Sequence, residues 1–170
     1  MATYHATGSL SRSIGMLPTP IDAEGRLRLF TDTFTVGSTN VSNPVAGSNN
    51  DQVVVGHGPL PAGCRVVGGF LAHNDMTSQT NPFLRVMFDV EANVGTTTPE
   101  LEFYTQMTHQ ISILEANWHV LIPYNPPNSD PFIAFLPSDY VGWVRPNVTG
   151  AFNITGAVMT IHIMFATADG

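Results

Sequence analysis

The chain has 170 residues, of which 43% are hydrophobic and only 11% are charged, and its formal net charge is −7. An average soluble domain carries roughly 25% charged residues, and subunit interfaces are depleted in lysine but keep arginine. All six basic residues here are arginines, so we expect other subunits to cover part of the surface. The acidic balance argues against direct contact with nucleic acid, no stretch has the ~20 apolar residues of a membrane helix, and the single Cys64 excludes an internal disulfide.

The first 25 residues differ in composition from the rest of the chain. They are rich in Ser, Thr, Gly and Pro and show weak periodicity. Such a segment is typical of an extended arm rather than of a folded domain. We therefore expect an extended N-terminal arm, residues 1–25, and one β-domain, residues 26–170. The arm is either unordered or laid across a neighbouring subunit, and the apolar Met16 and Leu17 favour the second alternative.

The first clear strand pattern spans Leu27–Val36, where the side chains alternate with a period of two. Two further strands, Gln52–His57 and Cys64–His73, flank a Gly-Pro-x-Pro-x-Gly turn at Gly58–Gly63. Proline fixes φ and lacks an N–H donor, so the two prolines predict the end of a strand rather than its middle. Gly63 adopts a positive φ readily, which predicts that it launches the second strand.

The rest of the chain continues this succession of strands and turns. Pro82–Glu91 predicts another strand, whereas residues 101–114 fit either one short helix or two strands with a kink. Both faces of the last segment, Gly150–Thr167, are largely apolar, which predicts a central strand covered on both sides. Together these patterns predict an all-β fold, a β-sandwich with the jelly roll as its expected topology. The remaining short strands are expected at Trp118–Pro123, Phe132–Leu136 and Val141–Arg145.

Residue types that carry catalysis or bind metals do not occur in the spacings that such sites need. The six histidines include no His-x-His or His-Glu-x-x-His pair, so we expect isolated structural residues. The carboxylate pairs Asp89/Glu91 and Glu100/Glu102 could serve glycoside hydrolysis, but a solvated sheet face explains them equally well. No Gly-x-Ser-x-Gly elbow is present. The sequence therefore predicts no enzyme activity, no metal ion and no cofactor.

One stretch resembles a known protein family. The segment Phe30-Thr-Asp-Thr-Phe34, followed by Asp51-Gln-Val-Val-Val-Gly-His-Gly-Pro-Leu-Pro-Ala-Gly-Cys-Arg-Val-Val67, is similar to the jelly-roll decoration (cement) proteins of tailed-bacteriophage capsids. The resemblance implies a viral structural protein without catalytic residues, assembled in the host cytoplasm and located on the capsid surface of the virion. It also implies a homotrimer whose partner is the major capsid protein, and which cross-links capsid subunits from outside the head.

Under this resemblance the arm clamps a neighbouring subunit and the sandwich acts as a rigid block. Two alternatives are kept: a tail-tube or head–tail connector component, which assembles as a ring, and a receptor- or carbohydrate-binding knob of a phage fibre. The knob would use exposed rings near the proline-rich turns, at Trp118, Tyr124, Tyr140 or Trp143, although core packing is the commoner fate of tryptophan. The expected partner-binding residues are Met16, Leu17, Pro18, Pro20, Arg26 and Arg28.

Overall fold

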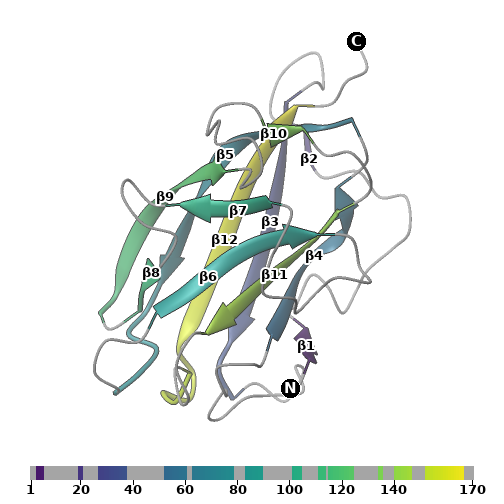
Figure 1. The fold of residues 1–170 in the computed structure, drawn as a ribbon. Coiled ribbons are helices and arrows are strands. Elements are labelled where there is room, and N and C mark those ends of the chain that lie inside the picture. The colour runs from purple at the N-terminus through teal and green to yellow at the C-terminus, as the bar shows by residue number, and fades with distance from the viewer. Residues whose placement is uncertain are drawn as a thin grey trace.

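A computed structural model describes residues 3–5, 19–20, 27–37, 52–60, 63–78, 83–89, 101–104, 111–113, 115–124, 134–135, 140–146 and 152–166. The regular structure of these residues is entirely β, which confirms the all-β prediction (Figure 1). Within the same ranges no helix is long and apolar enough to cross a membrane. The strands are β1 (Thr3–His5), β2 (Thr19–Pro20), β3 (Leu27–Thr35), β4 (Gln52–Leu60), β5 (Arg65–His73), β6 (Phe83–Asp89), β7 (Leu101–Tyr104), β8 (Ile111–Ser112), β9 (Asn117–Tyr124), β10 (Ala134–Phe135), β11 (Tyr140–Pro146) and β12 (Val158–Ala166).

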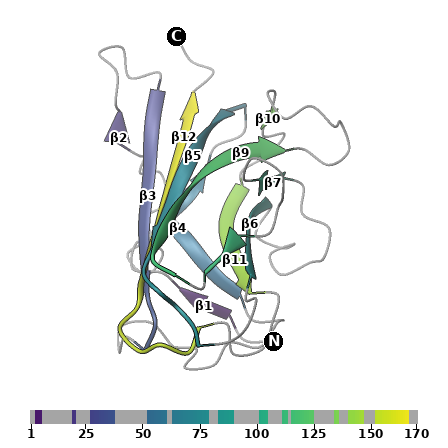
Figure 2. The ribbon, with the colours of Figure 1, turned by 90° about the vertical axis from the view of Figure 1, so that its left-hand side faces the viewer.

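The strands form two layers that face each other across the core (Figure 2). Sheet 1 has the order β9-β5-β12-β3, with β2 beside β3 and β10 paired to β5. Sheet 2 has the order β4-β11-β6-β7, with β1 beside β4 and β8 paired to β6. Strand β9 links the sheets, because its first residues pair with β5 and its last residues pair with β7. The sandwich is therefore closed along this side.

Strand β12 lies in the middle of sheet 1, between β3 and β5, so the prediction of a central strand is confirmed. It is shorter than predicted, because a turn that contains Gly156, at φ 86°, precedes it. Along β12 buried residues alternate with half-buried ones. Ile161 and Ile163 face the core, whereas His162 and Met164 face away from it. Among the described residues only sheet 2 covers β12, so cover on its second face stays a prediction.

Apolar side chains from the inward positions of both sheets fill the space between them. Phe30 of β3 meets Phe88 of β6 edge to face, with ring centroids 6.0 Å apart and ring planes at 67°. Phe34 and Phe152 form a second such pair at 5.3 Å. Aromatic side chains bury large apolar areas, so these contacts hold the two layers together. The other large, fully buried side chains of this core are Leu60, Leu71, Met76, Leu84 and Phe165.

The Gly- and Pro-rich corner carries the chain from sheet 2 to sheet 1, since β4 and β5 belong to different sheets. Gly63 has a φ of 83°, which confirms its predicted conformation. The turn is shorter than predicted, because β4 continues through Pro59 to Leu60. The register between β4 and β11 shifts between Val55 and Leu60. Proline is tolerated in this irregular segment because not every backbone N–H there has to donate a hydrogen bond to the neighbouring strand.

The ambiguous segment at residues 101–114 contains strands where it is described. β7 pairs with β6 and β9, and β8 pairs with β6. The alternative of a helix is therefore wrong for β7 and β8, while residues 105–110 lie outside the described residues.

The structure describes two short pieces of the predicted N-terminal arm, and each lies along a sheet edge. β1 runs parallel to Gln52–Val54 of β4, and β2 runs antiparallel to Arg28 and Leu29 of β3. Each piece covers backbone donors and acceptors that an edge strand otherwise exposes. The division into an arm and a domain stays a prediction.

Candidate functional site

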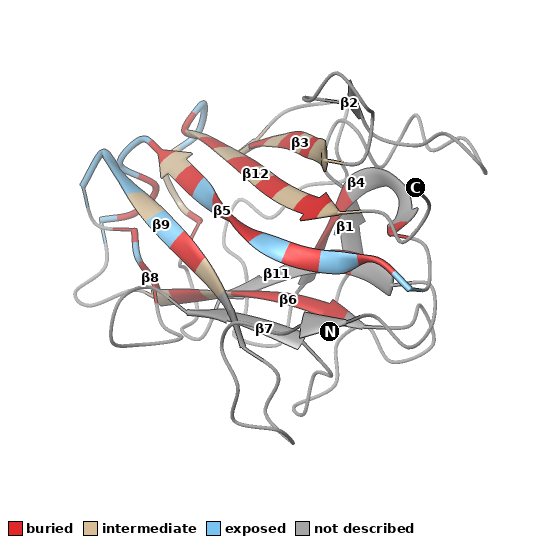
Figure 3. Cartoon of the chain, turned by 90° about the horizontal axis from the view of Figure 1, so that it is seen from above, coloured by how far each residue is buried: buried red, intermediate tan, exposed pale blue. Residues whose placement is uncertain are grey.

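The outward face of sheet 1, here called the sheet 1 face, is formed by alternate residues of four strands (Figure 3). Successive side chains of a strand point to opposite sides, so one set fills the core and the other faces solvent. The outward residues are Leu27, Leu29, Thr31, Thr33 and Thr35 on β3, Val158, Thr160, His162, Met164 and Ala166 on β12, Arg65, Val67, Phe70 and Ala72 on β5, and Trp118 and Val120 on β9.

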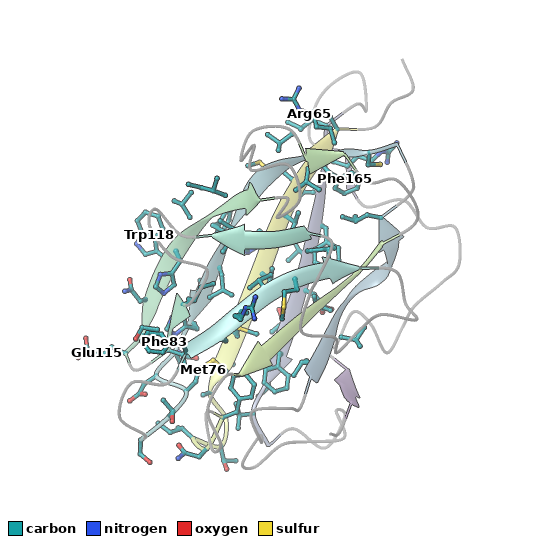
Figure 4. All side chains as sticks on the ribbon, in the orientation of Figure 1. Arg65, Met76, Phe83, Glu115, Trp118 and Phe165 are labelled. Carbon is teal, nitrogen blue, oxygen red and sulfur yellow. The ribbon has the colours of Figure 1, made fainter. Side chains whose placement is uncertain are left out.

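Four large apolar side chains on this face are exposed: Val67 by 50%, Phe70 by 40%, Trp118 by 67% and Val120 by 48%. Phe70 lies opposite Val120 in the register between β5 and β9, and Trp118 lies opposite Ala72. Trp118 stands at the periphery of the molecule (Figure 4). A single exposed apolar residue is common, but a contiguous group usually marks a contact surface. The sheet 1 face is therefore the candidate functional site.

A row of contacts crosses the centre of the sheet 1 face. Phe70 of β5 stacks on His162 of β12, with ring centroids 4.2 Å apart and planes at 24°. Nδ1 of His162 lies 2.9 Å from Oγ1 of Thr31 on β3. Burial lowers the pKa of His162 below its ordinary value, because the charged imidazolium loses hydration. His162 is therefore neutral at neutral pH and adds no charge to this face.

The charged residues of sheet 1 lie at its margins or point inward. Arg65 begins β5 and Glu115 precedes β9, and the two lie at opposite ends of the sheet in Figure 4. Arg28 and Asp32 occupy inward positions of β3. Asp32 is only 4% exposed, and its Oδ1 accepts a 2.7 Å hydrogen bond from the backbone N–H of Thr33. The centre of the face thus presents apolar groups and neutral hydrogen-bonding groups.

Two histidines meet across β5 and β9. The Nε2 atoms of His73 and His119 are 3.1 Å apart, and the rings are stacked with planes at 9°. Nδ1 of His73 lies 2.7 Å from the carbonyl oxygen of Asn74. In the neutral pair His73 donates from Nδ1 to that oxygen, so its Nε2 accepts a hydrogen bond from His119. The pKa of His119 is lowered, mainly by burial and secondly by the proximity of His73. A hydrogen bond with the backbone of Ser112 raises it by a smaller amount.

The sequence did not reveal this pair, because its members are 46 residues apart. Two nitrogens that hydrogen-bond to each other do not form a metal site, which needs at least three protein ligands. Among the residues that the structure describes, no group of three or more His, Cys, Asp or Glu side chains could hold a metal ion. The histidine pair is therefore a contact that joins β5 to β9.

Most of the predicted partner-binding residues lie outside the described part of the chain. Pro20 lies in β2 and is in register with Arg28 of β3. Arg28 is half-buried on an inward position, and its Nε atom is fully buried. The partner-binding role of the whole set stays a prediction. The residues outside the described ranges are Met16, Leu17, Pro18 and Arg26.

The aromatic residues considered for carbohydrate binding are divided between the two sheets. Trp118 lies where β9 pairs with β5, in sheet 1, whereas Trp143 lies on β11, in sheet 2. Tyr124 ends β9 and Tyr140 begins β11.

The carboxylate pairs considered for hydrolysis are only partly described. Asp89 ends β6 and Glu102 lies on β7, in register with Met87 of β6. Their sequence partners, Glu91 and Glu100, fall outside the described ranges.

Sequence reasoning did not predict the sheet 1 face, although one signal pointed toward it. The last strand is largely apolar on both sides, a pattern typical of a strand covered by two layers. Among the described residues only one layer, sheet 2, covers it. The apolar residues on the outward side of β12 are therefore the sequence signal of this face.

Comparison with known proteins gives a structural likeness but no sequence match, since no family model and no curated protein matches the chain. A chain of a structure described as "Capsid of Ralstonia phage GP4" has a TM-score of 0.61 at 14% identity, over 99% of this chain and 100% of that chain. A chain of "Cyanophage Pam1 capsid asymmetric unit" has a TM-score of 0.50 at 11% identity, over 91% of this chain and 94% of that chain. At such identities the likeness shows a shared fold: the chain has an all-β fold that also occurs in phage capsids.

Proposed function

We propose that this chain is a structural protein of a phage head and, within that role, a decoration (cement) protein that binds the outside of the capsid. One observation carries the proposal: the alignment with the chain from the GP4 capsid spans 99% of this chain and 100% of the other. The likeness is therefore to an entire small chain and not to one domain of a larger one. The low charge content, 11%, supports a surface that other subunits cover.

We also infer that the sandwich is a jelly roll. Eight strands carry the two layers, and in chain order they are β3, β4, β5, β6, β7, β9, β11 and β12. Sheet 1 contains the first, eighth, third and sixth of these, and sheet 2 contains the second, seventh, fourth and fifth. This order supports two Greek keys folded into facing sheets, which is the arrangement of a jelly roll.

The proposed mechanism is mechanical. The sandwich is the rigid block, and a homotrimer of it sits on the capsid surface, where the arm of residues 1–25 binds neighbouring major capsid subunits. Met16, Leu17, Pro18, Pro20, Arg26 and Arg28 are the proposed contacts, and assembly takes place in the host cytoplasm. When several arms bind together, each later contact is effectively intramolecular, so weak single contacts add up to a strong cross-link.

The test is binding of the purified protein to expanded heads that lack it, measured by co-sedimentation and by electron microscopy of the particles. We expect saturable binding at symmetry-related positions and greater resistance of the heads to heating. Absence of saturable binding would exclude the decoration role. A stable hexameric ring would instead favour the tail-tube or connector alternative, and glycan binding that depends on Trp118 would favour the knob.

The role of the arm is tested separately with Met16→Ala/Leu17→Ala, because deleting residues 1–25 would also remove β1 and β2 from their sheet edges. We expect this double variant to fold normally and to bind heads more weakly. Unchanged binding would remove the arm from the mechanism while leaving the decoration role intact.

A further inference from the structure

We propose that the sheet 1 face is the surface through which copies of this chain bind one another. The proposal deepens the proposed function, since it names the surface that builds the oligomer, and its occupant is a second copy of this chain. Three observations support it: the largely apolar character of both sides of β12, the cluster of exposed apolar side chains, and the absence of charge from the described centre of the face.

The first observation is the residue pattern of β12. Its inward residues are packed between the sheets, with Met159 and Ile163 fully buried. Its outward residues are half-buried: Val158, Met164 and Ala166 are apolar, and Thr160 and His162 between them are polar but carry no negative or positive charge at neutral pH. A strand that is largely apolar on both sides is typical of a sheet covered by two layers. The described part of the chain supplies one of these layers, sheet 2, and a second subunit would supply the other.

The second observation is the exposed cluster beside β12. Phe70 joins it to β12 through its stacking on His162, and Val120 and Trp118 extend it across β9. Trp118 is exposed by 67%, although tryptophan is among the side chains that contribute most to protein interfaces. Covering the apolar surface of phenylalanine, tryptophan and valine with protein is favourable, provided that the indole N–H of Trp118 finds a hydrogen-bond acceptor.

The third observation identifies the occupant by charge. The described outward residues of β3, β12 and β9 include no charged side chain, and on β5 only Arg65, at the end of the strand, is charged. A partner that brought charges against this face would leave them desolvated and unpaired, at a cost of several kcal/mol per ion. A second copy avoids this cost, because the chain has only 13 acidic and six basic residues in 170.

The size of the face is consistent with a stable interface. Three of its strands have nine residues each. These strands and the five residues of β9 that pair with β5 cover on the order of 500 Å² of backbone area, at about 3.3 Å per residue and about 4.8 Å between strands. Each partner contributes about 800 Å² to a standard interface. The sheet 1 face alone therefore supplies most of the area that one subunit needs.

The experiment measures the mass of the full-length protein in solution by size-exclusion chromatography with light scattering, over a dilution series. Val120→Arg places a charge in the exposed apolar cluster, opposite Phe70 in the register between β5 and β9. Thr155→Arg is the matched control, because Thr155 is exposed in the turn before β12 and adds the same charge away from the face. Trp118→Ala is a second test that adds no charge. Circular dichroism and thermal melting establish that each variant is folded.

We expect the unmodified protein and Thr155→Arg to form the same homo-oligomer. Val120→Arg and Trp118→Ala should remain folded and associate roughly 30-fold or more weakly, as is typical of an interface hot spot. A monomeric unmodified protein overturns the proposal. It is also overturned if Val120→Arg and Thr155→Arg both dissociate, or if neither does.

These outcomes are distinct from the test of the proposed function. A protein that self-associates through the sheet 1 face but does not bind heads retains this inference and loses the decoration role. A monomer that binds heads saturably retains the decoration role and loses this inference.

Discussion

Gly142 of β11 packs closely against both neighbouring strands of sheet 2, and its replacement by alanine tests how rigid the sandwich is. It is in register with Phe88 of β6 on one side and with Val55 of β4 on the other. A Cβ atom at Gly142 would lie 2.8 Å from Cζ of Phe88, 2.9 Å from its Cε1 and 2.9 Å from Cγ2 of Val55. Apolar carbons normally approach to about 3.5–4.0 Å. The added methyl group therefore requires both neighbours to move.

The cost follows from the burial of those neighbours. Phe88 is 0% exposed and Val55 is 2% exposed, so neither side chain has free space to move into. Adding a methyl group to a well-packed core costs about 1–3 kcal/mol. Alanine in a strand recovers about 0.5–1 kcal/mol relative to glycine. We expect Gly142→Ala to lower the free energy of unfolding by about 1–2 kcal/mol, or the Tm by roughly 2–8 °C.

The assay is urea unfolding of single and double variants at one fixed protein concentration, since association would otherwise shift the result. Phe88→Leu removes both ring atoms that collide with the new methyl group. In that background Gly142→Ala should cost less, with a coupling of about 1 kcal/mol. Gly156→Ala is the control: its Cβ meets no atom within 4 Å, and its cost comes from a φ of 86°, so it should be the same in both backgrounds. A Gly142→Ala protein as stable as the unmodified one, or strictly additive costs, would refute the reasoning.

Three further predictions concern sheet 1 and the core. Gly69→Ala should weaken the pairing of β5 with β12, because its Cβ would collide with the backbone oxygen of His162, and we expect faster amide exchange in both strands; unchanged exchange would contradict this. The free energy of unfolding should fall as the pH drops below about 6.5, because the lowered pKa values of His119 and His162 mean that the unfolded chain binds protons which the folded chain does not. Urea unfolding between pH 5 and 8, the range in which histidine titrates, measures how the free energy of unfolding changes with pH. His119→Gln should make this change smaller. An identical pH dependence in the variant would contradict the assignment. Cys64 is 2% exposed, so its thiol should react with a thiol reagent only as fast as the protein opens, and reaction at the rate of a free thiol would be inconsistent with its burial.

The proposed function is consistent with one physical property of the structure, the low charge of the sheet 1 face. A decoration protein must form many contacts with other subunits, and each buried charge would oppose that association. The sheet 1 face, centred on Phe70 and His162, satisfies this requirement without any exposed charge at its centre. The proposed arm contacts lie elsewhere in the chain, so self-association and head binding can be tested independently.

The sequence by itself determined where most strands lie. Alternation of side chains is a local property, so it placed β3, β5 and β6 within a residue or two of their observed bounds. It also determined the conformation of Gly63, because a turn of this composition requires a residue that tolerates a positive φ. The apolar pattern of Gly150–Thr167 likewise indicated a central strand, which β12 is.

Only the tertiary structure decided which strands become neighbours, because strand pairing depends on contacts between residues far apart in the chain. It assigned β4 and β5 to opposite sheets, although only the four residues 61–64 separate them. It brought His73 beside His119 across 46 residues, and it allowed Pro59 to remain in β4 through a shift of register. Among the described residues, it also left the outward side of β12 without a covering layer. Alternation indicates that a face is apolar, but only the packing of the whole chain reveals which apolar face is left for another subunit to cover.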